Sequence, residues 1–389
     1  MLPDFNNTEV AFKYRSNNEL KQAHLLFSFM GSPTLTKFGV KMTLGALSMN
    51  LPIHGIIKKT LFKQFCGGES MEEAAETATR IGAYKVKTIL DYGVEGKDSE
   101  ADFDRAVPEF IKAVKYAATQ KHIPFISMKV TGFSRFALLE KINSGKPLTD
   151  AEKAEWQRVH KRIDDICSVA YANNVMVLID AEETWIQEGV NELCETMMMK
   201  YNKTEAIIYN TYQFYSHGTL PYMKDNIKTA AEKGYILGAK LVRGAYMEKE
   251  RERAKEMGYE DPIQPNKAAT DRDYDEGAIY CLQNLDKLAV FIGTHNEKSC
   301  MTAAQFMEEN KIPNNHPRVY FSQLFGMSDN ISFNMAHEEY HVAKYLPYGP
   351  VKDVAPYLMR RAEENTSVAG QTPRELSMIE QELKRRKLN

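Results

Sequence analysis

Short apolar stretches that alternate with longer helical patterns constrain the fold of this chain more than any other feature. Eight stretches of strand length are rich in β-branched and aromatic residues, and several are apolar along their whole length. A strand that is apolar on both faces is typical of a parallel sheet covered by helices. The eight stretches are 86–91, 124–130, 175–181, 206–210, 236–242, 289–294, 319–324 and 340–346.

The intervals between these stretches leave room for a helix in nearly every case. Eight strand–helix repeats are the number that closes a (βα)8 TIM-type barrel, although an open doubly wound sheet shows the same alternation. We predict an α/β fold with a barrel catalytic domain over 81–370, an N-terminal helical arm or subdomain over 1–80 and a C-terminal helical tail over 371–389. A capping box at 149–152 begins one helix, and the apolar positions after it share one face.

Composition is that of an ordinary globular protein and excludes several classes. Hydrophobic residues make up 43% and charged residues 26%, and 50 Lys+Arg against 52 Asp+Glu give a net charge of −2, so we expect no nucleic-acid partner. No apolar run approaches the roughly 18 residues of a membrane span, and we expect no signal peptide.

The five cysteines are widely spaced without a CxxC pair, which suits a reducing cytoplasm. The basic run 384–387 is typical of a helix end, with peripheral contact to the inner face of the membrane as the alternative.

Polar residues gather at the predicted carboxyl ends of the strands. In barrels of this kind the loops at these ends converge on one mouth, where the chemistry takes place. Because buried Lys and Asp are rare unless paired, we expect a common site rather than separate ion pairs. In strand order the residues are Asp91 with Glu95, Lys129, Asp180 with Glu182, Asn210, Lys240 with Arg243, Thr294 to Asn296, Ser322 with Gln323, and Tyr345.

A second group of residues lies on a predicted helix near the end of the chain. At helical spacing Tyr357, Arg360, Arg361 and Glu364 share one face. Two adjacent guanidinium groups repel each other unless an anion joins them, and arginine is suited to bidentate binding of a carboxylate. The tyrosine on the same face favours an anion clamp over the structural alternative, a solvated salt-bridged face.

The segment 240–246 predicts a strand that ends in a glycine turn. Gly244 would let the backbone approach a ligand closely. The sequence has neither GxGxxG after a strand nor GxxxxGK[ST], so a Rossmann site and a P-loop are both unsupported. His295 together with Asp180 and Glu182 suggests a metal, but the histidines show no HxH or HExxH spacing. We therefore predict no metal site.

Four motifs together resemble the flavin-dependent proline dehydrogenases: IDAEE at 179–183, KLVRGAYM at 240–247, GTHN at 293–296 and YLMRRAEEN at 357–365. The resemblance covers about 84–368. It implies a barrel with a displaced final helix and non-covalently bound FAD. The implied reaction of proline catabolism oxidises L-proline to Δ1-pyrroline-5-carboxylate by hydride transfer from C5 to flavin N5, with electrons passed to quinone. Because no aldehyde dehydrogenase region follows, the resemblance is to the monofunctional members.

The resemblance also implies roles for single residues. Arg360, Arg361 and Lys129 would bind the substrate carboxylate, supported by Glu364, and Glu95 would be a gate that pairs with Arg360 when the site is empty. Leu241, Tyr246, Tyr345 and Tyr357 would wall the ring, with Asp180 in the same pocket. The implied FAD contacts are Asn210, Lys240, Val242, Gly244, Lys267, Thr270, Thr294, His295 and Asn296, with Ser322 or Gln323 from the seventh strand. Lys240 and Asn210 stand where many relatives have Arg and Gln, and Lys240 would be the cation beside the flavin ring.

Three alternatives stay open at this point. A hydroxyproline dehydrogenase is the nearest, although the ring of Tyr345 should crowd a 4-hydroxyl group. A metal-dependent hydrolase would use Asp180, Glu182 and His295 in the same barrel. A binding protein without turnover is the third, which the concentration of charges at the strand ends disfavours.

Overall fold

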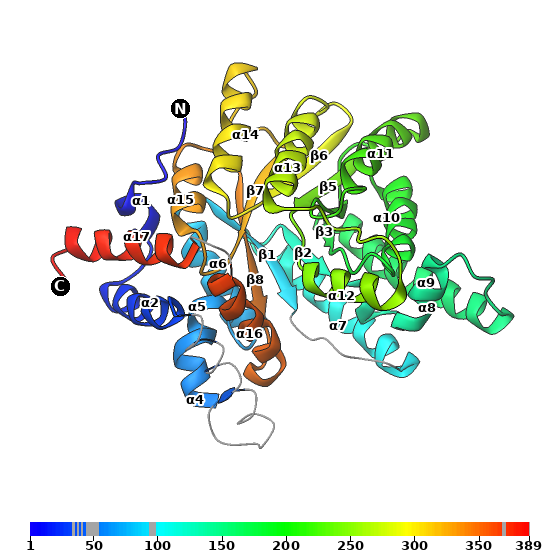
Figure 1. Cartoon of the computed structure of the whole chain (residues 1–389), viewed down its shortest axis with the longest axis horizontal. Helices are drawn as coiled ribbons and strands as arrows, with labels where there is room; N and C mark the ends of the chain where they lie inside the picture. Colours follow the sequence, from blue (N-terminus) through cyan, green and yellow to red (C-terminus); the bar gives the residue numbers. More distant parts are fainter. Residues whose placement is uncertain are drawn as a thin grey trace. The chain divides into compact units, whose positions relative to one another are not determined.

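The computed structural model describes residues 1–32, 36, 39, 42–43, 54–92, 99–367 and 371–388. Its strands form one closed barrel in the order β1-β2-β3-β4-β5-β6-β7-β8 (Figure 1). β8 pairs with β1, and β2 through β6 pair in succession, all in parallel, as a strand–helix alternation requires. The predicted (βα)8 barrel is confirmed. The strands are β1 Val86–Tyr92, β2 Phe125–Met128, β3 Met176–Ile179, β4 Ile208–Gln213, β5 Leu237–Val242, β6 Leu288–Gly293, β7 Val319–Leu324 and β8 Val342–Tyr348.

Several strand ends differ from the predicted ones. β4 continues to Gln213, beyond the predicted end at Asn210, and β8 continues to Tyr348. β2 ends at Met128, and a single 3-10 turn follows over Val130–Gly132. Asn210, predicted as the last residue of its strand, therefore lies inside β4, while Lys240 and Tyr345 lie inside their strands as predicted. In the middle of a strand the side-chain direction depends on the register, because successive residues point to opposite faces.

The chain groups into two compact units. The first contains Met1–Glu95 and Ser322–Asn389, and the second contains Gly96–Phe321. The predicted boundaries near 80 and 370 stay predictions. In the second unit helices cover the outer side of the strands (Figure 1). The helices of this unit are α7 Glu100–Ala118, α8 Phe136–Asn143, α9 Asp150–Ala172, α10 Gln187–Tyr201, α11 Thr219–Lys233, α12 Met247–Met257, α13 Lys267–Leu282 and α14 Glu297–Glu309.

Aromatic rings fill the barrel interior of the second unit. The ring of Phe291 on β6 lies 4.9 Å from that of Phe125 on β2, 5.3 Å from that of Tyr209 on β4 and 5.0 Å from that of Tyr320 on β7. Because β2, β4 and β6 are not neighbours in the barrel, these rings can meet only inside it. The aromatic layer therefore identifies the inward-facing residues of β2, β4, β6 and β7.

Helix α9 shows how local sequence signals set an element. The Thr149 hydroxyl accepts a hydrogen bond from the Glu152 N–H, and the Glu152 side chain bonds back to the cap, so the predicted capping box is confirmed. The predicted apolar face is buried at Val159, Ile163 and Ile166. This helix packs on α7 and β3 and supplies no chemistry.

The first unit is largely helical before β1, as predicted for residues 1–80. Helix α6 packs on β1 and β8, whereas α16, which follows β8 in the chain, packs on α2, α4 and α17. The predicted displacement of the final helix is therefore confirmed, since α6 occupies the side of β8 and β1 that a regular eighth helix would cover. The helical segments of this unit are α1 Thr8–Phe12, α2 Asn17–Met30, α4 His54–Ile57, a π-helical turn Lys58–Phe62, α5 Lys63–Phe65, α6 Met71–Gly82, α15 Asp329–His337, α16 Val351–Ser367 and α17 Gln371–Arg385.

A buried charged cluster joins the arm, β8, α15 and the tail of the first unit. The Asp329 carboxylate on α15 lies 3.0 Å from the Lys344 Nζ of β8 and accepts a hydrogen bond of 2.8 Å from the Arg15 Nη2. Glu375 of α17 is also buried and accepts a hydrogen bond from the Ser328 N–H. Buried charged groups are tolerated here because each has a hydrogen-bond or ion-pair partner within the cluster.

The basic run at the end of α17 is partly engaged within the first unit. Arg385 and Arg386 both bond to the buried Glu382 carboxylate, and Arg386 also donates to the carbonyl groups of Phe12 and Arg15. These contacts agree with its interpretation as a helix end, and a membrane contact stays an alternative. In the ranges given above, no helix has both the length and the apolarity needed to cross a membrane.

Candidate active site

Two lysines and one aspartate meet above the aromatic layer of the second unit. Lys240 stands in register with Thr211 on β4 and with Phe291 on β6, so its side chain points into the barrel. There its ammonium group bonds to one oxygen of Asp180, which directly follows β3. The other Asp180 oxygen lies 3.5 Å from the Nζ of Lys129, which directly follows β2. The expected convergence of these three residues is therefore present in the geometry.

The Lys240–Asp180 pair is largely withdrawn from water. The side chains of Lys240 and Asp180 are only 8% and 13% exposed, whereas that of Lys129 is 32% exposed. Removing two charged groups from water is costly, and the attraction between the Lys240 ammonium and the Asp180 carboxylate offsets that cost. Each charged side chain is therefore stable in this buried position only while the other is present. Asp180 thus orients both ammonium groups, the deeper one at Lys240 and the more accessible one at Lys129. A pair of oriented cations at a barrel mouth suits the binding of an anionic group.

Glu182 lies next to this group and is 3% exposed. Its carboxylate accepts a hydrogen bond of 2.7 Å from the Thr131 hydroxyl and one of 3.4 Å from the Tyr246 hydroxyl. Burial raises the pKa of Glu182, and the positive charge of Lys129 opposes that increase. Glu182 was predicted to lie at a strand end, but the only role considered for it was that of a metal ligand.

The side chain of Asn210 does not lie where the resemblance placed it. Its amide nitrogen donates a hydrogen bond of 3.0 Å to the side-chain oxygen of Asn191 on α10, so it points outward. Gln213 shares the inward face of β4 with Thr211 and donates to the Glu182 carbonyl at 2.7 Å. Sequence reasoning missed Gln213 because it ended β4 too early. The signal was the continued alternation from Tyr209 through Thr211 to Gln213.

Leu241 also differs from its expected place. It is fully buried and stands in register with Ile292, on the face of β5 opposite to Lys240. The main-chain carbonyl of Leu241 is 3.5 Å from the Tyr274 hydroxyl of α13. Its side chain therefore packs between strand and helices and does not wall the barrel mouth. Val242 is half-buried on the inward face of β5, and its role as an FAD contact stays a prediction.

The turn after β5 requires glycine at position 244. Gly244 has a φ of +131°, and an added Cβ would lie 2.5 Å from the Tyr215 ring, so no other residue fits without movement. The preceding Arg243 points outward, where it donates to Thr294 at 2.6 Å and to Asp271 of α13 at 2.7 Å. The backbone is thus exposed at the turn, with a fixed guanidinium beside it.

Two helix N-termini accompany this turn. Burial alone would raise the pKa of Asp271, but hydrogen bonds from Lys267 and Arg243 lower it. Asn296 caps α14 by accepting from the N–H groups of Lys298 at 2.9 Å and Ser299 at 3.3 Å. The first turns of α13 and α14 are linked because Arg243 donates to Asp271 of one and to Ser299 of the other. Of the remaining predicted contacts, Thr270 is buried on the first turn of α13 and His295 is half-buried after β6.

The first unit holds the remaining predicted residues. Tyr345 is half-buried on the face of β8 opposite to Lys344. The Arg361 guanidinium lies 5.0 Å from the centre of the Tyr357 ring, so these two side chains share one face of α16. The side chains of Arg360 and Glu364, and the whole of Glu95, lie outside the described residues.

On β7 the two predicted residues point to opposite faces. Gln323 accepts a hydrogen bond of 2.7 Å from the Ser332 hydroxyl of α15, so its side chain faces the helix layer. Ser322 shares the inward face with Tyr320. The register therefore favours Ser322 over Gln323 as a residue of the barrel interior.

A family model described as proline dehydrogenase matches residues 74–374. This chain belongs to the proline dehydrogenase family. It is 30% identical over 384 residues to a protein named proline dehydrogenase 1, mitochondrial, from Dictyostelium discoideum, across 87% of this chain and 67% of that protein. It is 31% identical to a hydroxyproline dehydrogenase from Xenopus laevis, across 97% of this chain and 89% of that protein.

The fold is also that of a solved protein. A crystal structure of proline utilization A from Bdellovibrio bacteriovorus superposes with a TM-score of 0.72 at 21% identity, covering 94% of this chain and 37% of that one. The chain thus spans little more than a third of that protein, and at this identity the likeness shows the fold alone. Membership of the proline dehydrogenase family makes the chain a member of an oxidoreductase family and removes the support for a metal-dependent hydrolase.

The second unit has the features that a flavin dinucleotide needs. The Gly244 turn offers exposed backbone, the linked N-termini of α13 and α14 suit a pyrophosphate, and Lys240 is an inward-facing cation. By contrast, among the described residues no three His, Cys, Asp or Glu side chains are placed to hold a metal ion. The residues present therefore fit FAD, which in this family accepts the electrons removed from the substrate.

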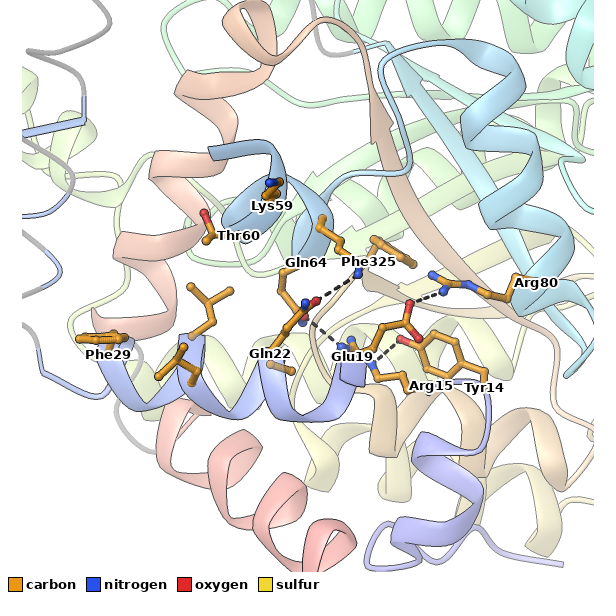
Figure 2. Close-up of a pocket in the computed structure, with 14 residues that line it drawn as sticks. Tyr14, Arg15, Glu19, Gln22, Phe29, Lys59, Thr60, Gln64, Arg80 and Phe325 are labelled. Carbon is orange, nitrogen blue, oxygen red and sulfur yellow. Dashed lines mark hydrogen bonds and ion pairs between the residues drawn. The ribbon is translucent and has the colours of Figure 1, made fainter. Parts of the chain in front are cut away.

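A surface groove in the first unit is separate from the predicted site residues. Gln22 and Phe29 of α2, Lys59 and Gln64 line it, and none of its lining residues belongs to the predicted set (Figure 2). Two of its lining residues, Arg15 and Gln64, are joined by a hydrogen bond of 3.0 Å. The groove therefore adds nothing to the site built above.

Proposed function

We propose that this chain is an FAD-dependent dehydrogenase that oxidises L-proline to Δ1-pyrroline-5-carboxylate and passes the electrons to a quinone. The observation that carries the proposal is the Lys129–Asp180–Lys240 cluster inside a barrel of the proline dehydrogenase family. Lys129 is the more exposed of the two lysines and would bind the substrate carboxylate, while Lys240 would lie beside the flavin.

Further residues of the predicted set would take part in substrate binding. We propose that Arg360 and Arg361 bind the same carboxylate, with Glu364 in support and Glu95 as the gate. The contact of Arg361 with the Tyr357 ring supports this, because it keeps the guanidinium on the predicted face of α16. Tyr357, Tyr345 and Tyr246 would wall the ring.

Each group would contribute through binding and orientation. FAD, when bound, supplies the acceptor for the hydride that leaves C5 of the substrate. The cations around the carboxylate would fix the ring and lower the pKa of the substrate ammonium group. The resulting neutral amine is the form whose lone pair assists hydride departure. We therefore expect kcat/KM to rise with pH through a substrate deprotonation.

The test is the flavin spectrum of the purified protein before and after anaerobic addition of L-proline. We expect absorption near ~450 nm that bleaches on mixing, since this band reports oxidised flavin. A colourless protein that does not take up added FAD, or a flavoprotein that proline leaves oxidised, would refute the proposal. Turnover with a soluble quinone in place of a dye then tests the acceptor, and sedimentation with anionic vesicles tests peripheral membrane contact.

Oxidation of hydroxyproline is the second candidate. The likeness to the Xenopus hydroxyproline dehydrogenase favours it, because that match covers nearly all of both chains. Tyr345 favours proline, since its half-buried ring would crowd a 4-hydroxyl group. Comparison of kcat/KM for L-proline and trans-4-hydroxy-L-proline decides, and a Tyr345→Ser variant should improve the ratio for hydroxyproline if the ring is responsible.

A further inference from the structure

Glu182 is a buried carboxylate at the barrel mouth for which the proposed reaction has no use. We propose that Glu182 is a positioning residue that holds the Tyr246 ring in place as a wall of the substrate pocket. This inference rests on the proposed function, because it assigns Tyr246 to the wall of that pocket. It differs from a catalytic role, since Glu182 would act on the substrate only through Tyr246.

The main chain of Glu182 is fixed on both sides. Its N–H donates a hydrogen bond of 2.8 Å to the side-chain oxygen of Gln187 at the start of α10. Its carbonyl accepts one of 2.7 Å from the side-chain nitrogen of Gln213 on β4. Gln213 also accepts from the N–H of Ala245, next to Tyr246, at 3.3 Å. The backbone of Glu182 is thus held by hydrogen bonds that do not involve its carboxylate.

The carboxylate of Glu182 spans two loops of the second unit. One oxygen accepts from Thr131, which follows β2, and the other accepts from the hydroxyl of Tyr246, which follows β5. A residue of the loop after β3 therefore connects the loops after β2 and β5. Because a carboxylate has two oxygens, it can accept both hydroxyl groups at once.

Tyr246 lies in the loop between β5 and α12, so no strand pairing holds its backbone and a hydrogen-bond acceptor for its hydroxyl matters more. It follows the exposed residues Gly244 and Ala245, and it precedes α12 without a side-chain cap. Burial raises the pKa of Tyr246 above its ordinary value, so its hydroxyl keeps its proton and donates to Glu182. Without this acceptor the ring would lose the bond that fixes its direction over the barrel mouth.

The charges that face Glu182 come from several elements. Lys129 after β2 lowers its pKa, whereas Glu183 in the same loop and Asp180 after β3 raise it. The neighbouring Glu183 is also buried, but within the described residues its carboxylate pairs with the exposed Lys249 of α12, and the Tyr246 hydroxyl donates to Glu182 instead. The Lys249 ammonium lies 5.8 Å from the centre of the Tyr246 ring, so Glu183 is coupled to this ring through Lys249.

The experiment is a double-mutant cycle on the flavin-loaded full chain, with kcat and KM for L-proline as readouts. Glu182→Ala and Tyr246→Phe should each raise KM about tenfold and change kcat less than about threefold, because each removes the same restraint on a binding wall. In the Tyr246→Phe background, Glu182→Ala should add less than about a twofold effect. As the control, Glu188→Gln, an exposed carboxylate of α10, should leave both constants unchanged.

Glu182→Gln keeps the proposal testable if the alanine variant does not fold. Its amide can still bond both hydroxyl groups, so KM should stay within about twofold of the wild type. Additive effects in the cycle, a tenfold rise in KM for Glu182→Gln, or an unchanged KM for Glu182→Ala would each overturn the inference while leaving the proposed function intact. A wild-type protein that oxidises neither proline nor hydroxyproline would refute the proposed function and this inference together.

Discussion

Replacing Glu375 by glutamine should make the first unit more stable above neutral pH. Burial, reinforced by the charge of Asp329, raises the pKa of Glu375 from 4.5 to about 7, against the opposing effect of Lys344 and Arg15. Through proton linkage, the difference between 4.5 and about 7 corresponds to an upper value of about 3 kcal/mol. Glutamine stays neutral at every pH and can still accept the hydrogen bond from the Ser328 N–H.

The sign of the effect follows from which state binds the proton more tightly. In the unfolded chain Glu375 ionises above 4.5, whereas in the folded protein it keeps its proton up to about 7. The stabilisation is therefore complete below 4.5 and is lost as the pH rises to about 7. Glu375→Gln should match the wild type near pH 4 and exceed it at pH 8, by roughly 3 to 4 °C in Tm.

Thermal unfolding followed by circular dichroism between pH 4 and pH 8 measures this difference. The matched control is Glu380→Gln, on the same helix but exposed, which should follow the wild-type curve at every pH. If the glutamine variant at 375 is less stable than the wild type at pH 8, the cations Lys344 and Arg15 keep Glu375 ionised. That outcome would refute the reasoning, because burial would then not be the dominant effect on this carboxyl.

Three further predictions concern the candidate site. Asp180→Asn leaves the buried Lys240 ammonium without its carboxylate, so urea unfolding should show a loss of about 3–5 kcal/mol, and a loss below about 1 kcal/mol would mean that water reaches this lysine. Gln213→Leu should release flavin during dialysis more readily than Asn210→Leu, because only Gln213 faces inward; equal flavin content at ~450 nm would contradict that assignment. Arg361→Met should lower kcat/KM for proline at least about tenfold through loss of a charge-assisted bond, and a loss within about threefold, below about 1 kcal/mol, would remove Arg361 from substrate binding.

Local signals in the sequence predicted most elements correctly. The capping box at Thr149 and Glu152 begins α9, and the apolar runs of the eight strands appear in the expected order. Such signals depend on a few neighbouring residues, so they can be recognised without knowing what the segment packs against. The same holds for Gly244, where a glycine after an apolar strand indicated a close turn.

The direction of side chains inside the strands was not predictable in the same way. Asn210, Leu241 and Gln323 were expected at the barrel mouth, but all three face the helix layer. Because side chains alternate along a strand, an error of one residue in the end or register moves a residue to the opposite face. The register depends on pairing between strands that are distant in the chain, so it is absent from the local pattern.

The order of strands and helices, the glycine turn and the residue types available for binding an anion are all properties of the sequence, because they depend on neighbours along the chain. The tertiary structure alone shows the pairing within this group, where Asp180 bonds to both Lys129 and Lys240, which lie 51 and 60 positions away. It also brought Glu182 between Thr131 and Tyr246. These contacts arise from closure of the barrel, which brings the carboxyl ends of strands together whatever their separation in the chain.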